Sequence, residues 1–220
     1  MTDATFQRAR SPEHKAQRRE AILAAAARLA RRDGVRAVTL GDIATEVRIH
    51  KSALLRYFET REQIFLELTA RSWREWAGAL GEALEAIAPG DAEAVAAALA
   101  DGFVSRPLLC DLIPHTALTL ERHVSLEAVR AYKHTSLGAV GAVAEAVSRA
   151  LPSLGVGRCR ELVSTAALLA GAMYQISTPP PPLAELYVTE PELGHALLDL
   201  RGRLERSALV TIRGLESAGP

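Results

Sequence analysis

Helix-forming residues run through this chain from end to end, and that pattern restricts the possible folds more than any other feature. Ala, Leu, Arg and Glu, which all favour helices, are abundant throughout. No segment alternates apolar and polar residues as a half-buried strand would. With 220 residues, 49% of them hydrophobic, the chain is long enough to bury one large core or two modest ones. The sequence therefore predicts an all-α fold.

Breaks in the helical pattern divide the chain into about nine helices. The first is predicted over residues 13–33, where the following Gly34 suits a left-handed cap. Two short helices should follow over residues 40–47 and 51–57, and a long fourth helix over residues 60–88. The remaining helices are predicted over residues 91–105, 125–151, 158–175 and 189–215, with short helical pieces near Pro107 and Pro114 and a stiff polyproline-like loop at residues 179–182.

Three threonines stand where helices are expected to begin. Each is followed three residues later by Asp, Gln or Glu, which is the spacing of a capping box. In that motif the two residues exchange hydrogen bonds between side chain and backbone. The pairs are Thr39 with Asp42, Thr60 with Gln63, and Thr189 with Glu192. They predict the starts of the second, fourth and last helices.

Charge is distributed unevenly along a chain whose formal net charge is zero. Residues 1–70 hold 13 Lys and Arg against 9 Asp and Glu, so this part carries a net charge of +4 and the rest carries −4. A basic N-terminal part followed by an acidic remainder favours a polyanionic partner that binds the N-terminal part only.

Residues 39–63, with the sequence TLGDIATEVRIHKSALLRYFETREQ, contain two short amphipathic helices joined by a few residues. We expect their apolar residues, Ile43, Ala44, Val47, Ile49 and Leu54, to pack against the first helix. In a helix-turn-helix of this kind one helix crosses the phosphate backbone and the second enters the major groove. The alternative is a basic, solvated face on an ordinary three-helix bundle. The sequence thus predicts a DNA-binding domain over residues 1–60.

Polar and cationic side chains of the second short helix stay exposed in this arrangement. Lys and Arg can bond the O6 and N7 atoms of guanine, and small side chains can pack on a thymine methyl. Hydroxyls and cations at element ends can hold phosphate oxygens. The expected DNA contacts are Thr39, His50, Lys51, Ser52, Ala53, Arg56, Tyr57 and Arg61. Arg8 and Arg10 in the N-terminal arm either reach a minor groove or belong to a disordered basic tail.

This segment resembles the TetR family of bacterial transcriptional repressors over about residues 15–65. The resemblance is carried by Ile43-Ala44, the Ile49-His50-Lys51 turn, Leu54, Tyr57-Phe58 and Arg61-Glu62. It implies that residues 61–220 form an all-helical regulatory domain that binds a small ligand and dimerises through its last two helices.

The chain departs from the family pattern at four places near the turn. Val47-Arg48 stands where the family usually has Ala-Gly, and an Arg in the left-handed conformation expected there costs about 1 kcal/mol relative to Gly. His50 replaces a Ser or Thr cap, Ser52 replaces a Gly, and Leu55 replaces an aromatic residue. One phosphate-binding hydroxyl is therefore expected to be missing.

A small ligand needs a mostly apolar cavity with a few polar anchors. An irregular stretch over residues 106–124 and aromatic residues on the flanking helices could supply it. The candidates are Trp73, Trp76, Phe103, His115, His123, Tyr132, Met173 and Tyr174, each of which could equally be ordinary core. The histidines and the two cysteines, Cys110 and Cys159, match no metal motif, and no cofactor is expected.

Apolar residues three or four apart on the last two long helices predict a dimer seam. Antiparallel pairs of such helices form a four-helix bundle when two subunits meet. The seam would contain Leu162, Ala166, Leu169, Leu193, Leu197, Leu200 and Leu204, although a core within one chain would use the same residues. A homodimer is favoured because a protein that reads one DNA half-site needs a symmetric mate.

Other classes of function find little support. The N-terminus lacks the apolar core of a signal peptide, and the longest apolar run, residues 166–174, is too short for a membrane span. No nucleophile–base pairing or Gly-rich phosphate loop indicates an enzyme. We therefore expect a cytoplasmic, homodimeric repressor that binds a palindromic operator and is released by a small, mostly apolar ligand. The alternative is a helical interaction module without sequence-specific DNA binding.

Overall fold

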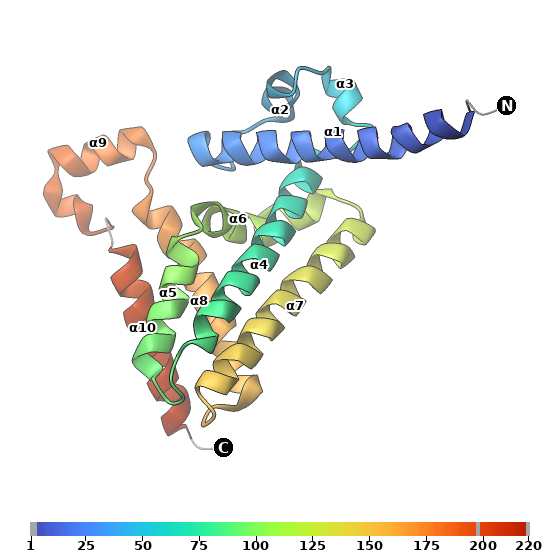
Figure 1. Cartoon of the computed structure of the whole chain (residues 1–220). Coiled ribbons are helices and arrows are strands. Elements are labelled where there is room, and N and C mark those ends of the chain that lie inside the picture. The colour runs from blue at the N-terminus through green and yellow to red at the C-terminus, as the bar shows by residue number, and fades with distance from the viewer. Residues whose placement is uncertain (1–3, 197–198, 219–220) are drawn as a thin grey trace. The chain divides into compact units, whose positions relative to one another are not determined.

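The computed structural model describes residues 4–196 and 199–218, and every regular element in these ranges is helical (Figure 1). The all-α prediction is confirmed. Contacts group the chain into two compact units, which we call the first and second units. The first comprises residues 1–68 and 116–130, and the second comprises residues 69–115 and 131–220. The predicted domain boundary after residue 60 stays a prediction, because compactness does not measure independent folding.

Four helices meet in the first unit around one small apolar core. They are α1 (Ala4–Asp33), α2 (Leu40–Glu46), α3 (Lys51–Leu54) and the first two turns of α4 (Arg61–Glu85). The largest fully buried side chains of this core, from the helices and from Phe58 between α3 and α4, include Ile22, Leu23, Ile43, Leu54, Phe58, Ile64 and Phe65. As predicted, Gly34 ends α1 in the left-handed region, with φ of 83° and a hydrogen bond from its N–H to the carbonyl of Ala30.

The link between α2 and α3 is a Schellman motif. The Ile49 N–H donates to the Ala44 carbonyl and the Arg48 N–H donates to the Thr45 carbonyl, each at 3.0 Å. Such a motif needs a left-handed residue directly after the cap, and Arg48 takes it with φ of 55°. Arg48 is the one non-glycine residue with positive φ within the described ranges. The turn therefore sets the direction of α3 at some cost in backbone strain.

A segment distant in sequence completes the first unit. The end of α6 (Pro107–Leu118), the 3-10 helix η1 (Leu120–His123) and the start of α7 (Leu126–Ala150) belong to it. The Thr60 hydroxyl donates to the carbonyl of His123 at 3.1 Å, and the Ser125 N–H donates to the Glu59 carboxylate at 3.2 Å. Two hydrogen bonds thus fasten this segment to the chain just before α4.

The second unit contains the rest of α4, α6 and α7, together with α5 (Ala92–Val104), α8 (Gly155–Ser177), α9 (Pro181–Thr189), η2 (Pro191–Ala196) and α10 (Leu200–Ser217). Helix α5 is central, since it packs against both α8 and α10. Seven of its thirteen residues are buried, and most of these are Ala or Gly, which let neighbouring helices approach closely. None of the helices in the described ranges is long and apolar enough to cross a membrane.

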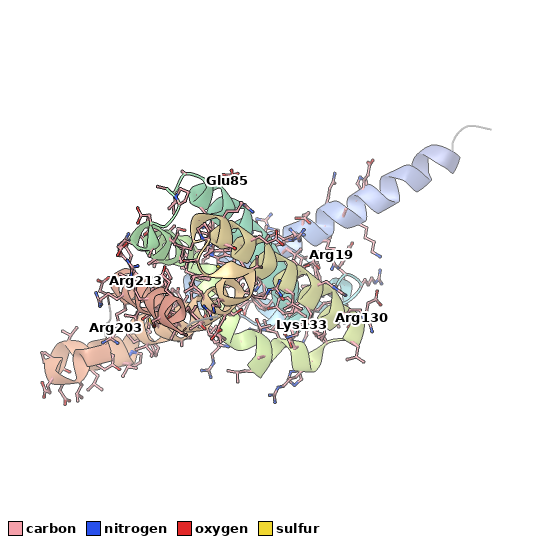
Figure 2. The ribbon with its side chains drawn as sticks, turned by 90° about the horizontal axis from the view of Figure 1, so that it is seen from below. Arg19, Glu85, Arg130, Lys133, Arg203 and Arg213 are labelled. Carbon is pink, nitrogen blue, oxygen red and sulfur yellow. The ribbon has the colours of Figure 1, made fainter. Side chains whose placement is uncertain are left out.

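Helix α10 packs onto this same bundle. Its stripe of Leu204, Ala208 and Ile212 is buried within the chain, against α5 and α8. Ion pairs flank this packing: Arg201 bonds Asp101, and Arg213, labelled in Figure 2, bonds Glu93 at 2.7 Å. Because all four side chains are largely exposed, these pairs add little stability, and the apolar stripe holds the helix.

Several predicted boundaries are wrong. Helix α1 begins at Ala4 and not near residue 13, so the N-terminal arm is helical there. Residues 107–118 form one helix with Pro114 inside it, and the polyproline loop ends at Pro180, since Pro181 is the first residue of α9. Thr189 ends α9 by donating to the carbonyls of Glu185 and Leu186, so it forms no capping box, and Asp199 caps the last helix instead.

Candidate nucleic-acid interface and effector site

Helix α3 and the residues on either side of it display the side chains that were predicted to contact DNA bases. His50, Lys51, Ser52 and Arg56 are exposed and Ala53 is half-buried, while Leu54 is fully buried. At 3.6 residues per turn Ser52 lies almost opposite Leu54, while Lys51 lies on the flank of the buried side. The first unit therefore presents two cations, an imidazole and a hydroxyl toward solvent, on a one-turn helix and the residues that flank it.

The start of α3 is weakly capped, as the sequence predicted. The His50 side chain makes no capping hydrogen bond, although its carbonyl accepts the N–H groups of Ala53 and Leu54. A helix of four residues leaves its first N–H groups without helical partners.

Thr39 forms the capping box predicted for the start of α2. Its hydroxyl accepts the Asp42 N–H at 3.2 Å and donates to the Asp42 carboxylate at 2.7 Å, while its own N–H donates to the same carboxylate at 2.8 Å. These bonds from the Thr39 side chain and backbone lower the pKa of Asp42. Thr39 is exposed, but its hydroxyl proton is already directed at Asp42.

Arg61 differs most from its predicted role at phosphate. Its guanidinium donates to the carbonyls of Val38 and Val35, pairs with Glu62 at 3.2 Å, and lies 4.6 Å from the centre of the Phe65 ring. The side chain is only 20% exposed. Because its donors point at the loop between α1 and α2, we assign Arg61 to holding the first unit together.

Arg19 on α1 plays a matching role that sequence reasoning missed. Its guanidinium bonds the carbonyl of Tyr57 and the carboxylate of Glu67, and it lies 4.0 Å from the centre of the Phe58 ring (Arg19 is labelled in Figure 2). Arg19 therefore joins α1 to the end of the α3 segment and to α4. The sequence carries no signal for this role, because Arg19 stands between Arg18 and Glu20 in a polar stretch of α1, where a cation ordinarily faces solvent.

Three predicted ligand residues form an aromatic cluster in the second unit. The Trp73 and Trp76 rings meet edge to face at 5.2 Å, and Trp76 stacks on Phe103 at 4.9 Å. All three are buried. Among the described residues, neither indole N–H of the pair has a hydrogen-bond acceptor. A buried donor without an acceptor costs about 1–3 kcal/mol, so these two N–H groups could be satisfied by a ligand carrying an acceptor.

Two further candidates lie beside a carboxylate that sequence reasoning did not single out. Asp111 on α6 is buried, accepts a 2.7 Å hydrogen bond from the Gln175 amide, and lies 3.6 Å from the His115 ring nitrogen. Burial, together with the negative charge of Asp111, raises the pKa of Tyr174. The same two causes raise the pKa of Cys110 to about 12, so this buried thiol is neutral at physiological pH.

The remaining ligand candidates do not share one site. Tyr132 is buried and Met173 is half-buried in the second unit. His123 belongs to the first unit, where it is exposed and hydrogen-bonded to the Thr119 carbonyl at 2.9 Å. Within the residues that the structure describes, no group of three or more His, Cys, Asp or Glu is placed to hold a metal ion.

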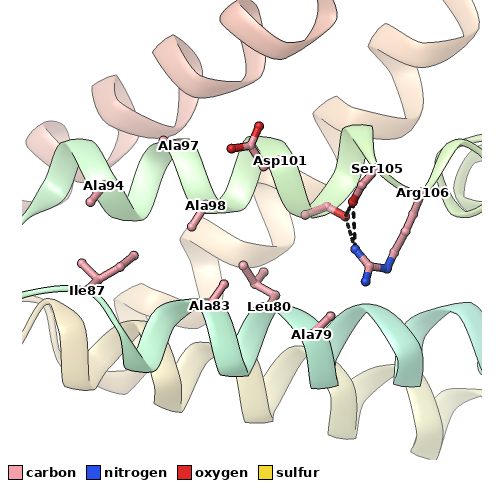
Figure 3. Close-up of a pocket in the computed structure, with 11 residues that line it drawn as sticks. Ala79, Leu80, Ala83, Ile87, Ala94, Ala97, Ala98, Asp101, Ser105 and Arg106 are labelled. Carbon is pink, nitrogen blue, oxygen red and sulfur yellow. Dashed lines mark hydrogen bonds between the residues drawn. The ribbon is translucent and has the colours of Figure 1, made fainter.

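A groove of about 530 Å³ lies between α4 and α5, and none of the predicted ligand residues lines it (Figure 3). Its walls consist largely of alanines, and Arg106 stands at one end. Sequence reasoning overlooked this groove because alanines on an exposed helix face read as ordinary helix formers.

The predicted dimer residues are placed unevenly. Leu162, Ala166 and Leu204 are buried within the single chain, so the prediction that they line a seam between subunits is not supported. Leu169 and Leu200 are half-buried, Leu193 is 39% exposed, and Leu197 lies outside the described residues. The large apolar residues that do face solvent on these helices are Val156, Leu168 and Ile176 of α8 and Val210 of α10.

Comparisons with known protein families cover nearly the whole chain. The family model of bacterial regulatory proteins of the tetR family matches residues 22–68. The model of the tetracyclin repressor-like C-terminal domain matches residues 70–219. A search of curated protein sequences gives no match.

Solved structures with the same fold include two regulators. FadR of Thermus thermophilus, a TetR family transcriptional repressor solved with lauroyl-CoA, is 18% identical, with a TM-score of 0.55 over 90% of this chain and 92% of that one. The fatty acid degradation regulator FadR of Bacillus halodurans is 11% identical, with a TM-score of 0.52 over 87% of this chain and 94% of that one. These identities show a shared fold. Together with the family models, which match both parts of the chain, they establish that this protein belongs to the TetR family of transcriptional regulators.

Proposed function

We propose that this TetR-family regulator is a homodimeric repressor that binds a palindromic operator through α3 and releases it when a small, mostly apolar effector binds the second unit. The observation that carries the proposal is the exposure of Lys51 on α3 and of Arg56 in the turn that follows it, while Leu54 at the end of α3 is locked into a core. A helix held in this way can enter a major groove without rearranging.

Base contacts are assigned to His50, Lys51, Ser52, Ala53 and Arg56. Tyr57, half-buried at the end of this segment, is assigned to phosphate, and Thr39 can take part only if its hydroxyl turns away from Asp42. A lone reading helix of this size makes too few contacts for specific binding. Two copies would read half-sites about 34–36 Å apart, or a multiple of that distance.

For the effector we assign the second unit, and within it the aromatic cluster of Trp73, Trp76 and Phe103. Two indole N–H groups without acceptors among the described residues support this assignment, because a ligand oxygen could accept from either. His115 and Tyr174, with the buried Asp111 near them, are candidates for polar recognition.

A route from effector to operator is supported by the segment that completes the first unit. Helices α6 and α7 each begin or continue in the second unit, and the residues that join them, 119–125, are hydrogen-bonded to Glu59 and Thr60 directly before α4. A shift of either helix on binding would therefore act on the first unit. A coupling free energy of about 1–3 kcal/mol would change operator affinity by about 5- to 150-fold.

Operator binding by point variants of α3 tests the proposal. Lys51→Ala and Arg56→Ala should each weaken specific binding by about 1–3 kcal/mol if they contact bases. Operator fragments would be selected from genomic DNA bound by the full-length protein, and affinities measured by fluorescence anisotropy at fixed salt.

The matched control is Arg74→Ala, which removes an exposed arginine of α4 in the second unit. It should leave operator affinity unchanged. If both α3 variants keep wild-type affinity and unchanged helical circular dichroism, α3 does not read the operator. If no genomic fragment is bound with sequence preference, the chain instead acts as a helical interaction module.

A further inference from the structure

The groove between α4 and α5 is apolar along its length. Five of its eleven lining residues are alanines, of which Ala79 and Ala83 on α4 are exposed and the other three are half-buried. The lining residues are Ala79, Leu80, Ala83, Ile87, Ala94, Ala97, Ala98, Asp101, Gly102, Ser105 and Arg106. On α5 the stretch from Ala94 to Gly102 spans about 12 Å at the usual helical rise. A narrow apolar body of about that length would fit along it.

Arg106 stands at one end of the groove, and only part of its guanidinium is hydrogen-bonded within the protein. The Nη1 group of Arg106 donates to the Gly102 carbonyl at 3.1 Å and to the Ser105 hydroxyl at 2.9 Å, and both acceptors are neutral. Among the described residues no carboxylate pairs with this guanidinium. Its Nε and Nη2 donors are not used by these bonds, and together they form the fork that binds a carboxylate through two parallel hydrogen bonds.

Asp101, the one acidic residue in the lining, does not compete for Arg106. Figure 3 shows its carboxylate turned away from α4, while the Arg106 side chain extends from the turn after α5 toward α4 at the end where Ala79 lies. Asp101 is held by Arg201 of α10, with bonds of 2.6 Å and 3.1 Å. The negative charge in the lining is therefore already compensated, and the positive charge is not.

We propose that this groove binds an amphiphilic carboxylate, with its apolar body along the alanine walls and its carboxylate on Nε and Nη2 of Arg106. Binding itself does not depend on the proposed function; only its effect on DNA does. The groove borders the aromatic cluster, because a Cβ added at Gly102 would lie 3.3 Å from Nε1 of Trp76. An occupant would thus change the surroundings of Trp76, which supplies an optical signal.

Titration of the full-length protein with decanoate, below its micelle concentration, tests the proposal. Binding would be followed by tryptophan fluorescence and calorimetry, with decanol as the uncharged counterpart. We expect decanoate to bind at least about tenfold more tightly than decanol. Arg106→Gln should weaken decanoate by about 10- to 100-fold, the range typical of a hydrogen bond to a charged group, and leave decanol unchanged. Ala98→Leu, which fills the groove and keeps Arg106, should weaken both.

Arg149→Gln, which removes an exposed arginine of α7, is the control and should change neither affinity. Equal binding of decanoate and decanol, or decanoate binding that survives both groove variants with helical circular dichroism intact, would overturn the proposal. A final arm adds decanoate to the operator complex. If decanoate binds through Arg106 but does not release DNA, the groove stands as a ligand site separate from the effector site, which the proposed function assigns to the aromatic cluster.

Discussion

At Arg48 the backbone adopts a conformation that side chains rarely tolerate. Its φ of 55° lies in the left-handed region, where a Cβ costs about 1–2 kcal/mol, and the Schellman bonds on either side hold it there. Arg48→Gly should therefore raise the free energy of unfolding by about 1 kcal/mol, after allowing for the greater freedom of glycine in the unfolded chain. Urea unfolding followed by circular dichroism would measure it.

The control for this prediction is Arg48→Ala. It removes the guanidinium but keeps the Cβ that causes the strain, so it should not stabilise the protein. An equal gain in both variants would mean that charge, and not backbone conformation, limits stability at this turn.

At the scale of single residues, the sequence predicted hydrogen bonds correctly where both partners lie close together in the chain. Thr39 with Asp42 forms the predicted capping box, and Thr60 accepts the Gln63 N–H at 3.1 Å, since both bonds depend only on residues three apart. The second bond of the predicted capping box, from the Thr60 N–H to the Gln63 side chain, is replaced by a bond from the N–H of Glu59 to that side chain. Arg61 could not be placed from the sequence, because its acceptors, Val35 and Val38, are more than twenty residues away.

At the scale of elements, Arg61 joins the start of α4 to the loop between α1 and α2. Arg61→Ala removes two hydrogen bonds from a charged group to carbonyls that are then left without them, so the free energy of unfolding should fall by about 2–4 kcal/mol. Arg61→Lys should recover little, since an ammonium cannot bridge both carbonyls and lie against the Phe65 ring. Denaturant unfolding of each variant is the measurement.

Lys51→Ala serves as the control for that experiment, because an exposed side chain without such bonds should change stability by less than about 0.5 kcal/mol. The opposite pattern is unchanged stability in Arg61→Ala together with weaker binding to all DNA sequences. That result would favour the phosphate contact first predicted for Arg61.

Helices with clear periodicity and strong end signals were predictable, and those shaped by packing were not. The starts of α2 and α3 agree with prediction to the residue, because Thr39 and the turn residues define them locally. Helix α6 continues through Pro114, which a sequence reading takes as a break. There α8 approaches closely: a Cβ at Gly171 would lie 3.0 Å from Pro114, so tertiary packing holds the helix across the proline.

At the scale of the whole molecule, the buried position of Leu204 argues against its predicted place in a dimer seam. Since Leu204 packs inside the chain, charges placed there would unfold the second unit and say nothing about assembly. Leu168 of α8 and Val210 of α10 are 69% and 71% exposed, and they are better probes of the outer face of these helices. Leu168→Glu with Val210→Glu should give a folded monomer, because burying unpaired charges in a seam costs several kcal/mol.

Light scattering with circular dichroism would measure this, and operator affinity should fall with the dimer. Leu137→Glu is the matched control, since Leu137 on α7 is 67% exposed and lies on neither helix of the proposed seam. A double variant that stays dimeric at micromolar concentration, or a control that also dissociates, would place the seam elsewhere.

The discontinuous first unit has a consequence for building hybrid regulators. Residues 116–130 belong to this unit although nearly fifty residues separate them from residue 68. A new reading head spliced onto this protein at a single crossover near residue 68 would lose the partners of His123 and Ser125, which Thr60 and Glu59 supply. Such a chimera could still recognise its operator while no longer responding to effector. The chimera would also need the donor residues that correspond to 119–125, so that operator recognition and the response to effector are transferred together.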